Sequence, residues 1–480
     1  MKPKSVDHAG HAPPPPAQKG AAAPTHAGME HAGAGHAGPG AAQQPMAISG
    51  EAHWAHFANM ILGAWLVTSA FALGYRSNAL QTSDVVSGTL VILLAVLSVS
   101  GSGFFRFWAP WANSLVGLWL LFAPLVFWAP TAAYSNDTLA GALVVAFAVL
   151  APGMPMAPGM SMETDPEVPA GWSYNPSSWA QRAPIIALAL VGFFLSRQMT
   201  SYQLGHVGSF ADPFFGGGTE SVLTSDVSRA FPIPDAGLGA VAYMVEVLMG
   251  FMGDRARWRT MPWMVTFFGI LVVPLGVVSI ALIILQPLAV GAWCTPCLAA
   301  ALAMLIMVAL TLDEVVAMLQ FLAQARREGQ SLWPIFWLGG KLNNPPEFPK
   351  VAVRPALLSP GALVWGVTLP WNLLASAALG VWLMLAPWAL GFAGTAAHSD
   401  HLVGALIITV AVTALADVGR AVRFVNVLLG AWIIIAPWLL AGATASARWN
   451  GLISGALVIL LSFPRGKIGE RYGDFERYIR

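Results

Sequence analysis

The sequence predicts an all-α polytopic membrane protein with about 12 transmembrane helices. The first observation is its composition, which is 56% hydrophobic and only 10% charged, with a mean hydropathy of +0.65. A soluble chain of this length carries far more charge. The second is that most of the 20 tryptophans lie near the ends of apolar runs, as residues of a membrane–water interface do. The net charge of +1 gives no indication of nucleic-acid binding.

The first 50 residues are rich in Ala, Gly, Pro and His, and we expect them to form a disordered tail. They lack the apolar core of a signal sequence, so membrane insertion is expected to begin near Ala58. Clustered His residues here, and Met154 to Met162 in a later Pro- and Gly-rich stretch, are chemically suited to copper. The alternative for both segments is a flexible linker without metal.

A repeated unit occurs four times, twice on each side of the middle of the chain. Each unit opens with a Gly-x-Trp motif and carries a second Gly 24 or 25 residues further on. In the last two units an Ala-Pro-Trp triplet follows, at 386–388 and 436–438, and we expect it to end the first helix of the unit. The two glycines are expected to let two helices pack closely in lipid. The motif glycines are Gly63 with Gly88, Gly117 with Gly141, Gly380 with Gly404, and Gly430 with Gly455. These units resemble SPW-repeat membrane proteins.

The only two cysteines form a Cys-x-x-Cys motif, Cys294 and Cys297, just before an apolar run. Thr295 is a possible helix cap and Pro296 suits a first turn, which places Cys297 in that turn and Cys294 just before it. Amide groups at a helix start favour a thiolate, which indicates a redox pair. Two inert core cysteines are an alternative. A metal site is a poor fit, because two ligands are too few for structural zinc.

Four spanning helices are predicted around the motif, at about 184–200, 236–253, 261–285 and 291–312, with Asp313-Glu314 at the end of the last one. The stretch from Ser201 to Asp235 is long enough for a structured lid, and its lone His206 is expected to be structural. With about 12 spans, both termini lie on one side. Most basic residues share that side, so it is expected to be cytoplasmic, with the motif on the outer face. The basic residues on the outer side are Arg76, Arg197, Arg229 and Arg448.

The central region resembles the vitamin K epoxide reductase family of membrane thiol oxidoreductases. The resemblance rests on the order of its motifs: Val222-Leu-Thr-Ser225 in the outer loop, then Pro234, Gly239 and Tyr243, then the Cys-x-x-Cys motif at the head of the fourth helix. It implies a four-helix bundle that binds a quinone, ubiquinone or menaquinone. It further implies that Cys297 faces the quinone, that Cys294 exchanges disulfides, and that Ser225 and Tyr243 lie at the quinone site.

The chain departs from this family in its outer loop. Members usually carry two further cysteines there, which pass electrons between partner thiols and the Cys-x-x-Cys pair. Here Thr219 stands where one of them is expected, and no thioredoxin-like domain follows the fourth helix. If the pair is active, a soluble dithiol protein reaches Cys294 directly or electrons follow another path.

The sequence therefore predicts a quinone-linked thiol–disulfide oxidoreductase of the plasma membrane, multi-pass, with Cys294 and Cys297 as catalytic residues and no metal. Its expected partners are the lipid bilayer and a thioredoxin-like periplasmic or extracellular dithiol protein. The alternative is a structural or copper-handling membrane protein with a relict reductase core. The expected divisions are a tail (1–50), two repeats (53–152), a Met/Pro-rich linker (153–182), the reductase-like domain (183–328), an interfacial connector (329–360), two repeats (361–464) and a basic cytoplasmic tail (465–480).

Overall fold

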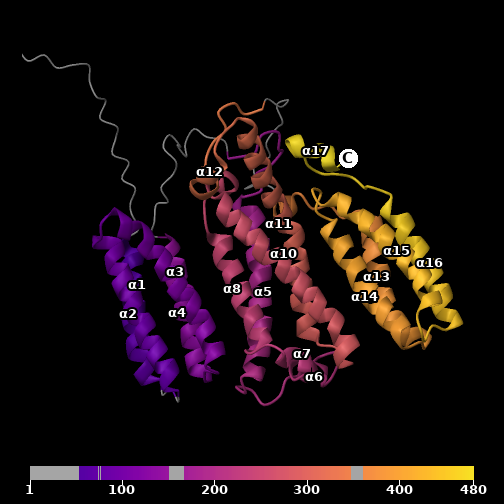
Figure 1. The fold of residues 1–480 in the computed structure, drawn as a ribbon, viewed down its shortest axis with the longest axis horizontal. Helices are drawn as coiled ribbons and strands as arrows, with labels where there is room; N and C mark the ends of the chain where they lie inside the picture. The colour runs from indigo at the N-terminus through magenta and orange to yellow at the C-terminus, as the bar shows by residue number, and fades with distance from the viewer. Residues whose placement is uncertain (1–52, 74, 76, 151–166, 347–359, 480) are drawn as a thin grey trace, which may run out of the picture. The chain divides into compact units, whose positions relative to one another are not determined.

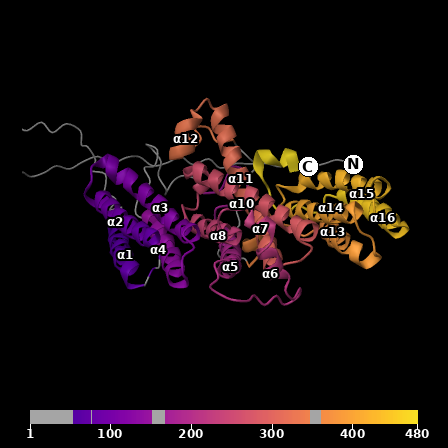
Figure 2. The ribbon, with the colours of Figure 1, turned by 60° about the horizontal axis from the view of Figure 1, so that its bottom comes forward.

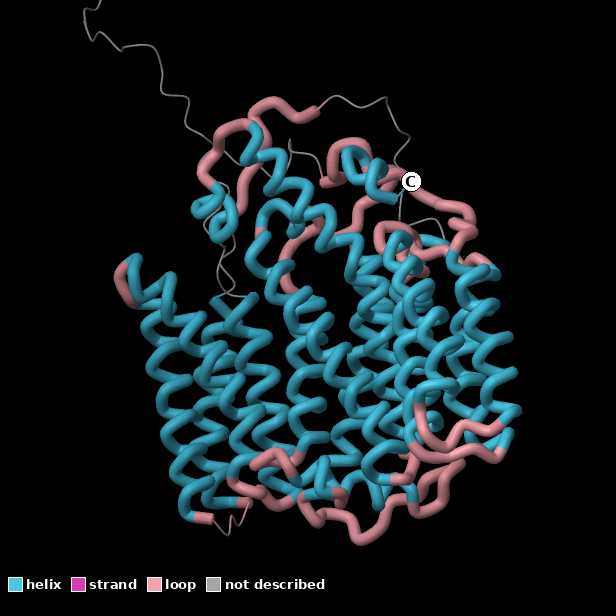
Figure 3. The backbone as a smooth tube through the Cα atoms, turned by 45° about the vertical axis from the view of Figure 1, so that its right-hand side comes forward, coloured by secondary structure: helices cyan, strands magenta, loops and turns pink. Residues whose placement is uncertain are grey.

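A computed structural model describes residues 53–73, 75, 77–150, 167–346 and 360–479. Within these ranges the chain is helical, as Figure 3 shows, and the only β pairing consists of three isolated bridges. The His-rich tail and Met154 to Met162 lie outside the described residues. Eleven of the described helices are long and apolar enough to cross a membrane. This confirms a polytopic, all-α membrane protein.

The first two repeats form a group of four helices, which we call the first repeat bundle (Figure 1, indigo to purple). Each repeat is a pair of neighbouring helices, and each helix of one pair also contacts a helix of the other pair. The apolar composition of every helix and the short connections between them favour this antiparallel packing. The helices are α1 (His53–Ala72), α2 (Asn78–Ser100), α3 (Gly103–Val126) and α4 (Thr131–Leu150).

The last two repeats form the second repeat bundle in the same way (Figure 1, orange to yellow). The expected role of the Ala-Pro-Trp triplet was wrong in one detail, because the first helix continues past the proline for less than one further turn. A proline near the end of a helix removes one hydrogen bond without stopping the last turn. The helices are α13 (Trp371–Leu390), α14 (Thr395–Thr413), α15 (Val425–Leu439) and α16 (Ala445–Ser462).

The paired glycines meet in all four repeats, which confirms their predicted role. A Cβ atom placed on Gly63 would lie 2.6 Å from the carbonyl oxygen of Gly88, and the reverse distance is the same. Across all four pairs the corresponding distances are 2.5–2.8 Å. Each repeat is therefore two helices whose backbones touch, a packing that any side chain larger than hydrogen would disturb.

The central domain lies between the two repeat bundles in the sequence, and its four long helices match the four predicted ones in order. Figure 2 shows it from below. The long helices are α5 (Trp179–Gln203), α8 (Asp235–Phe251), α10 (Pro262–Leu285) and α11 (Thr295–Arg327). Of these, α8 has 17 residues and a length of roughly 25 Å, slightly less than a bilayer core of about 30 Å. The shorter helices are α6 (Gly218–Leu223), α7 (Asp226–Arg229), α9 (Arg257–Thr260), α12 (Leu332–Leu338) and α17 (Glu476–Ile479), with a π-helical turn at Gln286–Val290 and 3₁₀ turns at Pro360–Val364, Arg420–Phe424 and Gly473–Phe475.

Helix α11 is longer than predicted, and Asp313 and Glu314 lie buried within it rather than at its end. The helix continues because other segments supply partners for both carboxylates. Arg257 binds Glu314 through two nitrogens, at 2.5 and 2.6 Å, and Tyr174 donates to Asp313 at 2.5 Å. A charge inside an apolar run predicts the end of a helix only when such partners are absent.

We call the end of the helices that carries Cys294 and the 204–234 loop the disulfide end, and the other the opposite end. In Figure 1 short helices α6 and α7 mark the disulfide end. At the opposite end the C-terminal segment packs onto the domain. Tyr472 is fully buried, and it pairs with Trp172 through an isolated bridge. The last residues of the chain are therefore part of the folded structure.

Candidate active site: the disulfide and its cavity

Cys294 and Cys297 form a disulfide at the start of α11. Pro296 lies in the first turn, as predicted, but the prediction of Thr295 as the cap was wrong. Cys294 is the cap, because its backbone is extended and its Sγ accepts a hydrogen bond from the Cys297 amide at 3.2 Å. The Thr295 hydroxyl instead donates to a carboxylate from the loop, Asp212. The exposed amides of a helix start thus point toward the sulfur pair.

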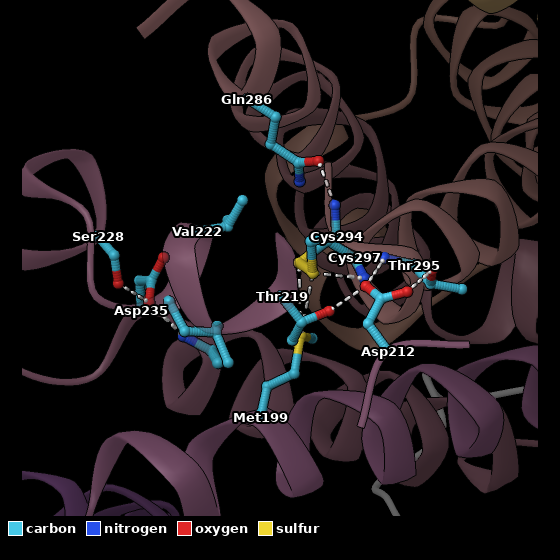
Figure 4. Close-up of a disulfide and its surroundings, with 12 residues drawn as sticks. Met199, Asp212, Thr219, Val222, Ser228, Asp235, Gln286, Cys294, Thr295 and Cys297 are labelled. Atoms are coloured by element: carbon cyan, nitrogen blue, oxygen red, sulfur yellow. Dashed lines mark hydrogen bonds between the residues drawn. A yellow bond between two sulfur atoms is a disulfide. The ribbon is translucent and has the colours of Figure 1, made fainter. Parts of the chain in front are cut away.

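The two sulfurs have different surroundings. Cys294 is fully buried and packs in a small apolar cluster with Met199 and Leu223. Cys297 is only partly buried. The Met199 Sδ atom lies 3.5 Å from Cys297 Sγ and 4.0 Å from Cys294 Sγ (Figure 4). Met199 could not be predicted as a site residue, because a methionine near the end of an apolar helix is typical of ordinary core packing.

The 204–234 loop is fastened to the start of α11 through Asp212. The Asp212 carboxylate accepts hydrogen bonds from the Thr295 amide at 3.0 Å and from the Thr219 hydroxyl at 2.5 Å (Figure 4). Burial alone would raise the Asp212 pKa, but the hydrogen bonds from Thr219 and Thr295 lower it below that of an ordinary carboxyl group. The Asp212 carboxylate therefore stays ionised in neutral and mildly acidic solution, and its hydrogen bonds to Thr219 and Thr295 are kept. Thr219 occupies the position at which the resemblance implied a cysteine. Here its hydroxyl donates to Asp212 and so helps to hold the loop against the start of α11.

Cys297, Ser225 and Tyr243 line one cavity, so the structure brings these three predicted site residues together. Cys294 lies behind Cys297 and is not part of the cavity wall. The wall is contributed by α5, the loop helices, α8, α10 and α11, and most of its side chains are apolar. The other polar residues of the wall are Ser196, Ser228, Asp235, Ser279 and Gln286, and its apolar residues include Met199, Val222, Leu223, Leu282 and Ala300.

The hydroxyl groups of Ser225 and Tyr243 are already engaged. Ser225 caps α7: it accepts from the Ser228 amide at 3.3 Å and donates to the Val222 carbonyl at 2.7 Å. Tyr243 donates to the carbonyl oxygen of Ala300 at 2.7 Å. Both residues thus shape the cavity, and neither hydroxyl proton is directed into it.

Gln286 is a cavity residue that the sequence reasoning missed. It opens the π-helical turn between α10 and the disulfide, and it is 3% exposed. Its side-chain oxygen accepts a hydrogen bond from the Cys294 amide at 3.1 Å. A carboxamide within an apolar run is unusual, because burying it is costly. This is the feature of the sequence that could have identified Gln286 as a site residue.

Other expectations can be compared with the described residues. His206 is structural, as predicted, since its Nε2 lies 2.7 Å from the Ala129 carbonyl oxygen. The expected lid contains α6 and α7. Within the described ranges, no group of three or more His, Cys, Asp or Glu side chains is placed to hold a metal ion.

A disulfide at a helix start beside an apolar cavity, within a bundle of membrane-spanning helices, is the arrangement of a membrane thiol–disulfide oxidoreductase. Comparison with protein families agrees: residues 183–312 match the vitamin K epoxide reductase family, whose members are quinone-linked oxidoreductases. Residues 53–151 and 370–464 match the SPW repeat domain. The chain thus carries a vitamin K epoxide reductase family domain between SPW repeat domains. Searches of curated proteins and of solved structures find no match.

Proposed function

We propose that this protein is a quinone-linked thiol–disulfide oxidoreductase of the plasma membrane, with Cys294 and Cys297 as its catalytic residues. Both termini are cytoplasmic in this proposal, and the disulfide end faces outward. The support for this orientation is the distribution of basic residues, few of which fall at the disulfide end of the sequence-predicted spans. An exported face is also the side on which thiol–disulfide exchange normally takes place.

The observation that carries the proposal is the unequal placement of the two sulfurs. Cys297 lines the cavity together with Ser225 and Tyr243, whereas Cys294 lies outside its wall. This supports Cys297 as the sulfur that faces a quinone and Cys294 as the sulfur that exchanges with a partner thiol. These are the roles that the family resemblance implied.

The cavity suits a quinone, because its wall is mainly apolar and carries a few polar side chains together with Cys297. A bound ubiquinone or menaquinone would supply an acceptor for two electrons and two protons. The ring would be held among the side chains of α5, α8, α10 and α11. Met199, which also lines the cavity, packs against both sulfurs.

The proposed cycle begins with exchange between a dithiol partner and the Cys294–Cys297 disulfide. A thiolate of the partner attacks Cys294 Sγ, the bond to Cys297 breaks, and Cys297 is released as a thiolate at the positive end of α11. The second partner thiol then attacks the mixed disulfide and leaves Cys294 reduced, with the partner oxidised. Re-formation of the Cys294–Cys297 bond releases two electrons and two protons, which a bound quinone would accept.

Access to Cys294 requires movement of the 204–234 loop, because Cys294 is fully buried in the closed arrangement. The fastening of Asp212 to Thr295 and Thr219 keeps this loop in place. Without a loop cysteine to relay electrons, a thioredoxin-like dithiol partner has to reach the pair itself. We therefore include opening of the loop as a step of the proposed cycle.

The test is quinone-dependent thiol oxidation by membranes that contain the protein, with Cys294→Ser and Cys297→Ser variants. Each variant is expected to lose activity entirely. When mixed with the partner in its oxidised, disulfide form, Cys297→Ser is also expected to trap a mixed disulfide between Cys294 and the partner, visible on a non-reducing gel, whereas Cys294→Ser traps none. Ala323→Ser, an exposed position on α11 at the opposite end, is the matched control. Unchanged turnover in both cysteine variants would disprove the proposal.

The alternative of a structural or copper-handling protein depends on the His-rich and Met-rich segments, which lie outside the described residues. It predicts copper binding that is lost when residues 1–50 are removed, with no effect of the cysteine variants on thiol oxidation. The same set of membranes distinguishes the two functions.

A further inference from the structure

Gln286 joins the disulfide to the cavity. It lines the cavity wall next to Cys297, and its side-chain oxygen is bound to the backbone of Cys294. Figure 4 shows this carboxamide directed at the Cys294 amide. Burying a carboxamide in an apolar segment costs free energy unless its polar atoms have hydrogen-bond partners. Both the oxygen and the NH₂ group of Gln286 therefore require a partner.

The orientation of the carboxamide follows from its partner. The Cys294 backbone N–H is a donor, and a carboxamide has a single acceptor atom, its oxygen. The oxygen therefore faces Cys294, and the NH₂ group points the other way. The NH₂ group makes no hydrogen bond to any residue that the structure describes, although Gln286 is 3% exposed.

The position of Gln286 is fixed by the backbone around it. It begins the π-helical turn Gln286–Val290, and such turns are frequent at functional sites. The turn closes at Gly291, whose φ of +69° is left-handed and whose amide donates to the Gln286 carbonyl at 2.8 Å. The side chain is thus carried on a rigid turn and not on a mobile loop.

Three other polar side chains of the cavity already donate to protein oxygens. They are Ser225, Tyr243 and Ser228, the last of which donates to Asp235 at 2.7 Å. A quinone ring offers only acceptors, its carbonyl oxygens. Gln286 has donor hydrogens left for such an oxygen, as do the hydroxyls of Ser196 and Ser279 in the same wall. Of these side chains, only Gln286 is also bound to the backbone of the disulfide.

We propose that Gln286 binds a quinone carbonyl oxygen through its NH₂ group and so holds the ring beside Cys297. The proposal rests on the function proposed above and assigns a binding residue to the same site. Its hydrogen bond strengthens as negative charge develops on that oxygen, which favours electron transfer as well as binding. Through its oxygen, the same side chain fixes the Cys294 backbone, so the disulfide and the ring are aligned by one residue.

The test compares the wild-type full-length protein with Gln286→Met, which keeps the side-chain length and removes both the NH₂ donor and the oxygen that accepts from the Cys294 amide. The KM for a short-chain ubiquinone or for menadione is expected to rise at least tenfold, equivalent to about 1.4 kcal/mol. The rate at which a dithiol reduces the disulfide without quinone, followed by thiol trapping, is expected to change by a smaller factor than the KM, because it depends only on the lost contact with Cys294. Gln324→Met, a buried glutamine of α11 at the opposite end, is the control and should change neither.

A second measurement tests the hydrogen bond itself. Equilibrium binding is compared between a quinone and a ring analogue of the same shape without carbonyl oxygens. The wild type is expected to prefer the quinone about tenfold, and Gln286→Met to bind both equally. An unchanged KM, an unchanged preference, or an equal fall in both half-reactions would overturn the role of Gln286. Absence of quinone reduction by the wild type would instead contradict the proposed function.

Discussion

In the first and second repeat bundles, the two repeats are held together by the same kind of contact. In both, the tryptophan of each Gly-x-Trp motif donates across the bundle to a polar side chain on the second helix of the other repeat. The distances differ little between the bundles. They are 2.7 Å for Trp65 to Asn136, 3.0 Å for Trp119 to Ser83, 2.8 Å for Trp382 to Asn450 and 3.0 Å for Trp432 to Ser399. The two bundles are therefore two copies of one packing solution.

Their attachments to the central domain differ. The first bundle contacts it at the disulfide end, where Arg197 lies over the ring of Tyr134 at 4.6 Å and His206 meets the Ala129 carbonyl. It also contacts the domain at the opposite end, where the ring centroids of Trp111 and Trp263 are 5.2 Å apart. At the opposite end of the second bundle, the fully buried Asp417 holds the segments that flank the bundle's helices to the C-terminal segment, which packs against the central domain. Asp417 accepts from Arg420 at 2.8 Å and from Thr368 at 2.7 Å, and also from the Gly469 amide of the C-terminal segment at 2.9 Å.

The second bundle also reaches the candidate active site. Helix α14 contacts α10, α11 and the π-helical turn, and the ring of His401 lies 6.0 Å from that of Trp293, the residue before Cys294. A buried ion pair is far more sensitive to loss of one partner than a partly exposed cation–π contact. The two bundles thus share one packing but differ in their contacts with the rest of the chain, and the following variants measure that difference.

The largest effect is expected for Asp417→Ala, which leaves the Arg420 guanidinium buried without its carboxylate. The expected loss of stability is about 3–5 kcal/mol, because an unpaired buried charge is strongly destabilising. The thermal unfolding midpoint in detergent measures it. The control is Asp474→Ala, which removes an exposed pair with Arg327 and should cost about 1 kcal/mol or less. Equal shifts for the two variants would contradict the view that the second bundle is held by a buried charge.

Gly88→Ala and Gly404→Ala test the shared packing. In each, the new Cβ lies 2.6 Å from the carbonyl oxygen of the paired glycine, so the helices must separate. Each variant is expected to lose about 1–3 kcal/mol, by overpacking. Gly208→Ala adds a methyl where no atom lies within 4 Å and serves as the control. A large difference between the Gly88 and Gly404 variants in unfolding midpoint would show that the bundles do not share one packing solution.

Arg197→Gln tests the attachment of the first bundle. It removes the cation over Tyr134 and the hydrogen bond to Ser135 at 2.9 Å. The expected loss is about 1 kcal/mol, because the contact is only partly buried. Hydrogen exchange should quicken at the start of α4 and stay unchanged in α14. Faster exchange in both helices would indicate that the two attachments are coupled.

The smallest effects are expected for Trp65→Phe and Trp382→Phe, which remove the indole donor and keep an aromatic ring. Each loses one hydrogen bond at an exposed site, worth about 0.5–1.5 kcal/mol. The two variants should shift the unfolding midpoint by the same small amount. If one shift is several times the other, the tryptophan contacts of the two bundles are not equivalent.

Much of this architecture was predictable because its signals are local. Apolar runs predicted the spanning helices, and the recurrent Gly-x-Trp motif with a second glycine predicted helix pairs in contact, as Gly63 and Gly88 show. The spacing of Cys294 and Cys297 before an apolar run predicted a sulfur pair at a helix start. Each of these patterns lies within one helix or within two consecutive helices. A short connection between consecutive helices limits the ways in which they can pack.

The tertiary structure alone decided which residues meet the disulfide. Met199, Asp212 and Gln286 come from three separate segments, and nothing in the spacing of the sequence relates them to Cys294. The same holds for Glu314, which continues a helix only because Arg257 reaches it. Sequence periodicity gives the apolar faces of helices, but contacts between distant segments depend on how those faces pack. The sequence therefore determined the sulfur pair and its helix, and packing determined that Cys297 faces the cavity.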